Sequence, residues 1–329
     1  MLLEQRSLKK LKPGEKVTDY FVVRKAEVRR KRTDGTPYLL LDLGNANGRI
    51  SAVLWEDAEA EAVRYPPGTR VKIQGRVAAY REGIALYIEK IRPVREEDGL
   101  EESDLIPGPR WPLEEMRARF DRLLALVADP NLSALLAAVF SPDFRPRFEC
   151  APAGKLWHHS RTGGLLEHTV GVAEICEFLA SRHPELQRDV LLTGALLHDA
   201  GKVAAYQMEQ GFIDFSDEGR LLGHVALGAA LVQKAVGGLA QFPSELATQV
   251  LHLILSHHGE MEKGASVVPM TLEAFVLYLA DELDAKIDAY LRIAERERTP
   301  ERRWSRYVRL LDRYLFFPPG LNLDNENGS

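Results

Sequence analysis

The alternation of hydrophobic and polar residues changes its period about a third of the way along the chain. Over the first 95 residues, apolar and polar side chains alternate in short runs bounded by turn residues, which is typical of half-buried strands. A short helix is expected over 56–64, where Pro66, Pro67 and Gly68 end it. The strands are expected over 17–30, 38–43, 50–55, 70–80 and 84–91.

Five strands with one short helix between the third and the fourth is the order of an OB-fold barrel. No single residue of this region is diagnostic, so an SH3-like barrel remains the competing prediction. We therefore predict an all-β OB-fold domain over residues 1–95.

The composition then changes. Six of the nine residues from 96 to 104 are acidic, and a Pro-Gly-Pro sequence follows at 107–109, which predicts an extended linker over 96–110. Beyond it the apolar residues recur at helical spacing, and no further strand is expected. We predict an all-α domain over 111–315 and a flexible tail over 316–329. Its helices are expected over 113–127, 132–140, 165–180, 185–198, 223–236, 245–256 and 272–292.

The net charge of −5 hides an asymmetry between these two regions. Residues 1–95 contain 20 Lys and Arg against 12 Asp and Glu, whereas the remainder contains 23 against 36. Such a division favours a basic module that holds a polyanion and an acidic module that holds cations. The alternative is a chance excess of solvated surface charge.

The composition also narrows the expected compartment. The N-terminal sequence has no apolar segment typical of a signal peptide, and the longest apolar runs are too short to cross a bilayer. Cys150 and Cys176 are the only cysteines, which excludes a disulfide framework and a cysteine-based zinc module. We expect a cytoplasmic protein with no membrane partner.

All nine histidines lie between His158 and His258. A single histidine is more often structural than a metal ligand, but nine within one predicted domain shift that balance. Several of them stand at the ends of apolar helices, and Asp281 lies in the middle of one, where an unpaired carboxylate would be costly. One or two divalent ions would partner these groups. Imidazole and carboxylate without thiolate fit Mn²⁺, Fe²⁺, Mg²⁺ or Zn²⁺. Of the divalent ions we expect Mn²⁺, with Fe²⁺, Co²⁺ and Mg²⁺ as alternatives.

The order His168, His198-Asp199, Asp281 resembles the signature of the HD superfamily of metal-dependent phosphohydrolases. The wider context resembles the YhaM-type 3′-to-5′ exoribonucleases, which join an N-terminal OB-fold to a C-terminal HD domain. That context comprises the His-His-Ser-Arg-Thr-Gly-Gly-Leu-Leu-Glu-His run that ends at His168, the Ser-His-His-Gly run around His258, and the acidic run after Ala280.

The resemblance implies particular ligands. One metal position would be held by His168, His198, Asp199 and Asp281. A second would be completed by His224, His257 and His258; adjacent helical residues point about 100° apart, so His257 and His258 can both ligate only where the helix ends.

Asp199, His198 and Lys202 are expected to be catalytic. Lys202 would neutralise charge at the phosphate, although a lysine that stabilises a helix C-terminus is an alternative. Asp284, one turn after Asp281, would orient a ligand or Lys286.

Substrate contacts are predicted in both domains. His158 and His159 would contact the substrate or lie behind the metal ligands. In the barrel, the basic run Arg29, Arg30, Lys31 and Arg32 would contact phosphates, and Trp55 and Tyr80 would stack on bases. Each aromatic residue has a competing assignment to the core.

The resemblance implies a metal-dependent 3′-to-5′ exonuclease. It would hydrolyse single-stranded RNA, and single-stranded DNA as well, to nucleoside 5′-monophosphates through a metal-activated water. Two alternatives stay open: an HD phosphohydrolase of a dNTP or cyclic dinucleotide, and a nucleic-acid-binding protein with an inactive site. The partners would be single-stranded RNA or DNA, and a homo-oligomer is left open.

Overall fold

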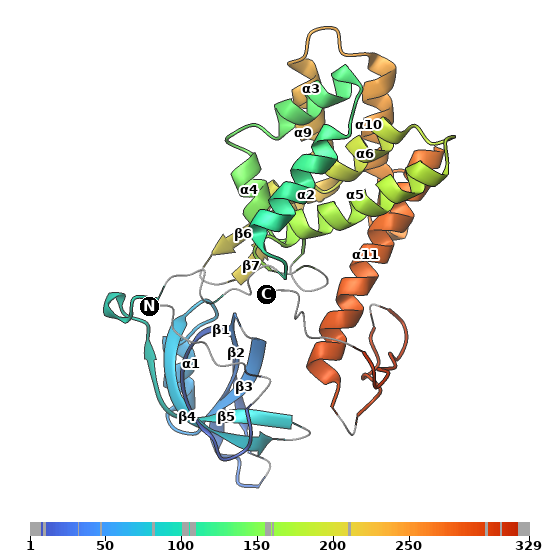
Figure 1. Ribbon diagram of the computed structural model, residues 1–329. Coiled ribbons are helices and arrows are strands. Elements are labelled where there is room, and N and C mark those ends of the chain that lie inside the picture. Colours follow the sequence, from blue (N-terminus) through green and yellow to red (C-terminus); the bar gives the residue numbers. More distant parts are fainter. Residues whose placement is uncertain are drawn as a thin grey trace. The chain divides into compact units, whose positions relative to one another are not determined.

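The computed structural model describes residues 8, 11–31, 33–46, 48–80, 83–100, 105, 110–154, 159, 161–209, 212–299, 302–309 and 311–321. The chain divides into two compact units (Figure 1). One comprises residues 1–108 with 207–214, and the other comprises residues 109–206 with 215–329. Each unit is described by itself.

The first unit contains a closed five-stranded barrel with strand order β1-β2-β3-β5-β4. β1 pairs antiparallel with both β2 and β4, and β3 pairs parallel with β5. This closure, with a helix between the third and fourth strands, is the OB-fold order and excludes the SH3-like alternative. The elements are β1 (Lys16–Arg30), β2 (Pro37–Asn45), β3 (Gly48–Leu54), α1 (Ala58–Arg64), β4 (Arg70–Tyr80) and β5 (Gly83–Pro93).

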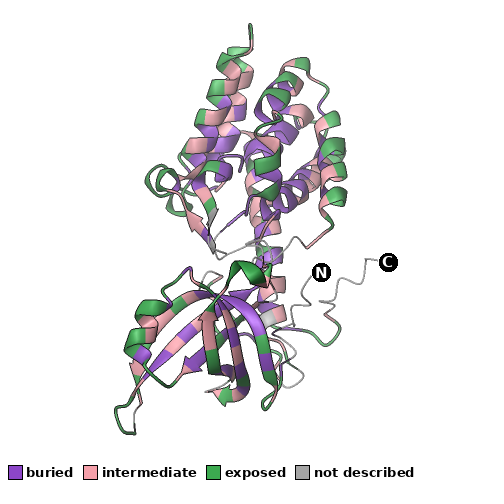
Figure 2. Cartoon of the chain, turned by 90° about the vertical axis from the view of Figure 1, so that its left-hand side faces the viewer, coloured by how far each residue is buried: buried purple, intermediate pink, exposed green. Residues whose placement is uncertain are grey.

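The barrel interior is filled by alternate residues of its strands. Leu39, Leu41 and Leu43 of β2 are fully buried, as are Phe21 of β1 and Ile73 of β4. Figure 2 shows the resulting bands of buried and more exposed residues along the strands. Each such side chain contributes about 1.5–3 kcal/mol to the free energy of folding when it is removed from water. The predicted alternation of apolar and polar residues therefore identifies the side chains of the barrel core.

The predicted linker begins as part of the barrel surface and not as an extended segment. Residues Glu96–Asp98 form a 3₁₀ turn, and Leu105 is fully buried. The Asp98 carboxylate accepts hydrogen bonds of 2.7 Å from Arg92 at both oxygens and one of 3.0 Å from the Tyr20 hydroxyl. The acidic composition of this segment is therefore partly structural, because Asp98 fastens it to the strands.

The second unit is helical, and each of the seven predicted helices forms within a few residues of its expected limits. Three short helices were missed because four to six residues do not establish a period. The helices are α2 (Leu113–Ala125), α3 (Pro130–Val139), α4 (Arg145–Cys150), α5 (Gly164–Arg182), α6 (Arg188–Leu197), α7 (Lys202–Ala205), α8 (Asp217–Leu221), α9 (Gly223–Gly237), α10 (Ser244–Ser256) and α11 (Leu272–Glu297).

The expectation of no further strand was wrong. β6 (Tyr206–Glu209) and β7 (Phe212–Phe215) pair as a two-stranded sheet between α7 and α8. Strands of four residues are too short for an alternating pattern to reveal.

The centre of the helical unit is formed by α5 and α6. α5 packs against α2, α4, α6 and α11, and α6 also packs against α10. Every residue from Val190 to Ala200 is buried, which includes the His198-Asp199 pair. A histidine and an aspartate thus follow directly from a helix that has no solvent-facing side over its last two turns.

Beyond α11 the chain returns to pack on that helix. Phe317 is fully buried in a cluster with Ile293, Ala294 and Leu315, and Phe316 forms a β-bridge with Trp304. Packed structure therefore continues beyond residue 316, where the flexible tail was predicted to begin. No helix in the described ranges is both long and apolar enough to cross a membrane.

Candidate metal centre

Five helices bring the predicted ligands together in the helical unit. His168 comes from α5, His198 from the end of α6, and Asp281 from α11, and these three offer ligand atoms within 4.8 Å of one another. His224, at the start of α9, forms a second such group with two histidines at the end of α10, His257 and His258.

Asp199 lies between the two groups. Its Oδ2 is 3.4 Å from Nε2 of both His168 and His198. Its Oδ1 is 3.4 Å from Nε2 of His224 and 3.6 Å from Nε2 of His257. One carboxylate therefore faces both groups, with one oxygen toward each, which is the arrangement of a bridging ligand.

The Asp199 oxygens are buried and accept no hydrogen bond within the described part of the chain, and the same absence of a partner holds for Nε2 of His257. The Lys202 ammonium lies 2.6 Å from Oδ2 as an ion pair, without the angles of a hydrogen bond. An unsatisfied buried carboxylate costs several kcal/mol. A divalent cation on each side of Asp199 would remove that cost.

The histidine rings are oriented as metal ligands. Nδ1 of His198 donates to the Ala195 carbonyl at 2.8 Å, and Nδ1 of His257 donates to the Ile254 carbonyl at 2.7 Å. His258 donates in the same way to a carbonyl 3.0 Å away. Because a carbonyl only accepts, Nδ1 carries the proton in each ring, and the Nε2 lone pair is directed into the centre.

The end of α10 resolves how adjacent histidines can share one centre. The helix ends at Ser256, and the chain turns at Gly259, whose φ of +76° is in the left-handed region. His257 still has helical dihedrals, and His258 lies between it and this turn, with its Nε2 3.2 Å from Nε2 of His224. Both His257 and His258 therefore reach the second group.

The surroundings shift the histidine pKa values in opposite directions in the two ligand groups: the pKa of His168 is raised and that of His258 is lowered. Burial alone would lower the pKa of His168, but the carboxylates of Asp281 and Asp284 raise it to about 10. Burial, together with the neighbouring His257, lowers the pKa of His258 to about 4. Burial would raise the pKa of Asp199, yet the Lys202 ammonium and the neighbouring His198 hold it well below its usual range.

Two glycines allow this close assembly. A Cβ on Gly201 would lie 2.1 Å from the His224 carbonyl oxygen, so α9 could not approach the His198-Asp199 turn. A Cβ on Gly171 would lie 2.4 Å from Oδ1 of Asp284. The sequence analysis missed both residues, because a glycine inside a helical pattern indicates close approach but does not identify the neighbour.

Behind His168 lies a chain of hydrogen bonds. Nδ1 of His168 donates to Oδ2 of Asp284 at 2.7 Å, and Nε2 of His159 donates to the same oxygen at 3.0 Å. Nδ1 of His159 accepts from Arg161 at 3.2 Å, and Arg161 is also paired with Glu167 and Asp288. The network fixes the His168 ring from the side opposite the centre.

The network places His159 behind the metal ligands, which is one of the two positions predicted for it. The His159 side chain is 7% exposed, and its backbone N–H donates to Asp288 at 2.7 Å. His158 is outside the described residues. Arg161, Glu167 and Asp288 were not predicted as site residues. Arg161 and Glu167 stand in the run that ends at His168, and the signal for Asp288 was the recurrence of acids one turn apart on α11.

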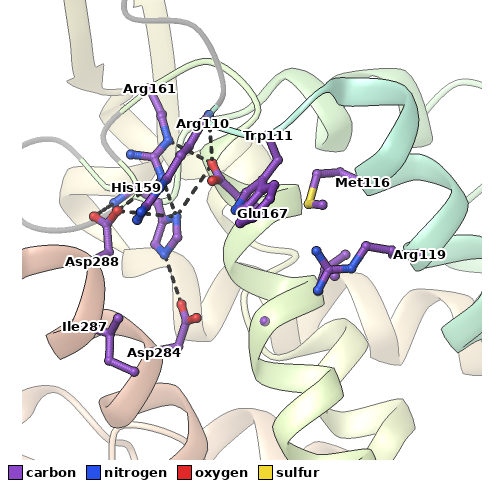
Figure 3. Close-up of a pocket in the computed structure, with 12 residues that line it drawn as sticks. Arg110, Trp111, Met116, Arg119, His159, Arg161, Glu167, Asp284, Ile287 and Asp288 are labelled. Atoms are coloured by element: carbon purple, nitrogen blue, oxygen red, sulfur yellow. Dashed lines mark hydrogen bonds and ion pairs between the residues drawn. The ribbon is translucent and has the colours of Figure 1, made fainter. Parts of the chain in front are cut away.

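A pocket of about 210 Å³ opens beside the network (Figure 3). Trp111 and Arg119 on the α2 side, and Ile287 of α11, are among its walls, and His159 and Asp284 also line it. Asp284, which was predicted to orient a ligand or Lys286, can therefore also be reached from the pocket.

In the barrel, four aromatic side chains form a group on neighbouring strands. The ring centroid of Trp55 is 5.1 Å from that of Tyr38 and 5.7 Å from that of Tyr87. The hydroxyls of Tyr38 and Tyr80 are 3.4 Å apart, and Nζ of Lys31 is 4.5 Å from the Trp55 ring centroid. Trp55 is 36% exposed and Tyr38 is buried, so Trp55 is the member that presents a ring to solvent.

The other described residues of the predicted basic run have different partners. Arg29 is paired with Glu27 at 2.6 Å. Arg30 donates to the Gly35 carbonyl at 3.3 Å, and Arg32 is outside the described residues. Lys31 is therefore the member of the run that the structure associates with an exposed aromatic ring.

Comparisons with known proteins agree with this architecture. Residues 165–286 match the HD domain family, and residues 22–94 match the OB-fold nucleic acid binding domain family. The chain is 32% identical over 306 residues to the 3′-5′ exoribonuclease YhaM of Bacillus subtilis, covering 93% of this chain and 96% of that one. The corresponding protein of Bacillus licheniformis gives the same identity and coverage.

The barrel also resembles a solved structure, the second OB-fold domain of replication protein A from Methanococcus maripaludis. The identity is 22%, the TM-score is 0.23, and the match covers 28% of this chain and 95% of that one.

An HD-domain nuclease implies a divalent metal, and the residues present fit one. The unsatisfied oxygens of Asp199 and the inward Nε2 atoms provide a mixed oxygen and nitrogen donor set in two adjacent groups.

Proposed function

Because the chain belongs to the YhaM family of 3′-to-5′ exoribonucleases, we propose that it hydrolyses single-stranded RNA from the 3′ end to nucleoside 5′-monophosphates. One observation supports this above the others: the buried carboxylate of Asp199 has both oxygens unsatisfied and lies between two ligand groups. We extend the proposal to single-stranded DNA, because stacking and a basic surface tolerate either sugar.

In this proposal His168, His198, Asp199 and Asp281 would hold one ion, and the His224 group, with Asp199 beside it, would hold a second. Mn²⁺ suits this donor set best, and Fe²⁺, Co²⁺ and Mg²⁺ are alternatives. When bound, such an ion lowers the pKa of water and withdraws charge from a phosphate.

The chain's own side chains set the geometry of the reaction. Lys202 is 7% exposed and is held 2.6 Å from Oδ2 of Asp199, so its charge is fixed at the edge of the centre. Burial lowers the pKa of Lys202, but Asp199 raises it above its ordinary value, and the amine stays protonated. A fixed ammonium there would bind the scissile phosphate and stabilise its developing charge.

The barrel would hold the strand that the centre shortens. The exposed ring of Trp55 offers a stacking surface, and Lys31 beside it offers a charge for a phosphate. Stacking on one aromatic ring contributes about 1–3 kcal/mol per base. We expect Trp55→Ala to raise the KM for an oligonucleotide about tenfold while leaving kcat nearly unchanged, because Trp55 is not in the helical unit.

The cytoplasm is the compartment that we propose, since neither Cys150 nor Cys176 is in a disulfide.

The test uses the full chain with a 5′-labelled single-stranded RNA and Mn²⁺. We expect a ladder of products that shortens from the 3′ end, together with nucleoside 5′-monophosphates. Asp199→Asn should abolish the ladder, and RNA binding measured by fluorescence anisotropy should be retained. Absence of shortening with each of Mn²⁺, Mg²⁺, Co²⁺ and Fe²⁺ would overturn the proposal.

A further inference from the structure

The long helix α11 exposes a row of large apolar side chains. Each is between 50% and 57% exposed. We call them the α11 stripe: Leu272, Phe275, Leu279, Leu283 and Ile287. Their spacing of three or four residues places them along one face of the helix.

The other side of α11 is also apolar. Ala274, Leu277, Ala280 and Ala289 are all buried, and the first three belong to the main core. Ala294, seven residues after Ile287 and therefore on the same face as the stripe, is covered by the chain that returns after the helix. A helix that is apolar on both sides is normally covered on both, and five adjacent half-exposed side chains exceed the scattered exposure of ordinary surfaces.

We propose that the α11 stripe is covered by the α11 stripe of a second copy of this chain, with the two helices antiparallel across a two-fold axis at Leu279. The positions of the stripe are nearly symmetric about that residue. Phe275 and Leu283 lie four residues to either side of Leu279, whereas Leu272 lies seven before it and Ile287 eight after it. A two-fold axis requires a patch that complements itself, and this spacing provides one.

The antiparallel arrangement places apolar side chains of one copy against apolar side chains of the other. Phe275 would lie against the partner's Leu283, and Leu272 would lie near the partner's Ile287. The nearest charged side chains on this face are already paired within one chain: Glu282 is 2.9 Å from Lys286 and 3.3 Å from Lys263. Self-association therefore brings apolar surfaces together without confronting unpaired like charges.

The available area is sufficient for a specific interface. Five half-exposed side chains leave on the order of 500 Å² uncovered per copy, so two copies would bury about 1,000 Å², the lower limit for a stable interface. Met270, 69% exposed and just before α11, adds to this area. Exposed apolar residues also occur on other elements, such as Val63 on α1 and Leu221 with Leu222 at the end of α8.

The interface would adjoin the candidate metal centre. α11 supplies Asp281 and Asp284, and Ile287 is a wall of the pocket beside Asp284. A second copy would cover that wall and hold α11 in place along the turns that carry both carboxylates.

A cysteine at the axis tests the geometry directly. In a Cys150→Ser background, Leu279→Cys should form a disulfide between copies on mild oxidation, visible as a doubled mass on a non-reducing gel. Cys176 is buried and is left unchanged in every variant. The matched control is Leu272→Cys, whose two copies would lie about 21 Å apart along antiparallel helices, beyond the roughly 7 Å that a disulfide spans.

The mass in solution tests the association itself. Light scattering at tens of micromolar should give at least twice the chain mass of 36.9 kDa. Leu279→Lys should reduce it to one chain without unfolding, because the side chain is 57% exposed, whereas Val63→Lys, at 82% exposed, should not.

A wild-type mass of one chain would overturn the proposal. So would an oligomer in which Leu279→Lys changes nothing, or in which Leu272→Cys cross-links as readily as Leu279→Cys. Neither measurement uses RNA or metal, so these outcomes are independent of the exonuclease proposal.

Discussion

Replacing Asp284 by Asn tests whether the carboxylate behind His168 controls metal binding. Oδ2 of Asp284 accepts from Nδ1 of His168 at 2.7 Å and from Nε2 of His159 at 3.0 Å, and the side chain is 18% exposed. Asn keeps the shape and one acceptor but removes the negative charge. The His168 ring would then keep its position but lose the charge that makes its Nε2 a stronger ligand.

The expected size follows from these two bonds. Both are hydrogen bonds to a charged acceptor, each contributing about 1.5–3 kcal/mol, and part of that remains with the neutral amide. Loss of a carboxylate partner behind a ligating histidine typically weakens metal affinity by about 10–100-fold. We expect Asp284→Asn to fall in that range, which corresponds to about 1.4–2.8 kcal/mol.

The assay is a titration with Mn²⁺, in which calorimetry measures metal binding and the rate of RNA shortening measures activity. The Mn²⁺ concentration for half-maximal activity should rise 10–100-fold, and the rate at saturating Mn²⁺ should approach the wild-type rate. Glu282→Gln is the control, because Glu282 lies on the same helix but pairs with lysines at the surface. Affinity within twofold of wild type would refute the reasoning. Loss of activity at every Mn²⁺ concentration would instead make Asp284 a direct ligand.

Two further predictions concern stability. The hydrogen bonds from Arg92 hold the pKa of Asp98 well below its usual range, so its stabilisation is present above the ordinary carboxyl pKa and is lost as the pH falls below it. Asp98→Asn should therefore lower the barrel's melting temperature at pH 7 and reduce the further drop between pH 5 and pH 3; equal drops in both proteins would exclude this role. Gly171→Ala should lower the melting temperature, although Ala in a helix normally gains about 1 kcal/mol over Gly, because its Cβ would lie 2.4 Å from Asp284. A rise in melting temperature would show that α5 and α11 separate without cost.

The sequence predicted the barrel well because its signals are local. Turn residues and alternation placed β1 and β4 within one residue of their observed starts. The parallel pairing of β3 with β5 has no local signal, since it depends on closure of the whole barrel. The α4, α7 and α8 helices and the β6–β7 pair were missed because each is shorter than the pattern that would reveal it.

The same distinction holds for the metal centre. His198 and Asp199 were predictable because they end a buried apolar helix, where charged groups need a reason. The roles of Arg161 and Asp288 were not, because both residues act by holding other side chains, and their contact joins positions 127 residues apart. The role of His159 depended on a contact with Asp284 across 125 residues, which no local pattern contains.

The burial of α6 also has a consequence for the timing of motion in the centre. Amide hydrogens in a helix with no exposed side exchange only through large-scale unfolding. The amide of His198, which donates to the Gly194 carbonyl at 2.8 Å at the end of α6, should therefore be among the last to exchange. His224, at the start of α9, and His258, just after α10, are half-buried and can fluctuate locally. The centre thus joins a slowly exchanging half to a faster one, and Asp199 lies at the boundary between them.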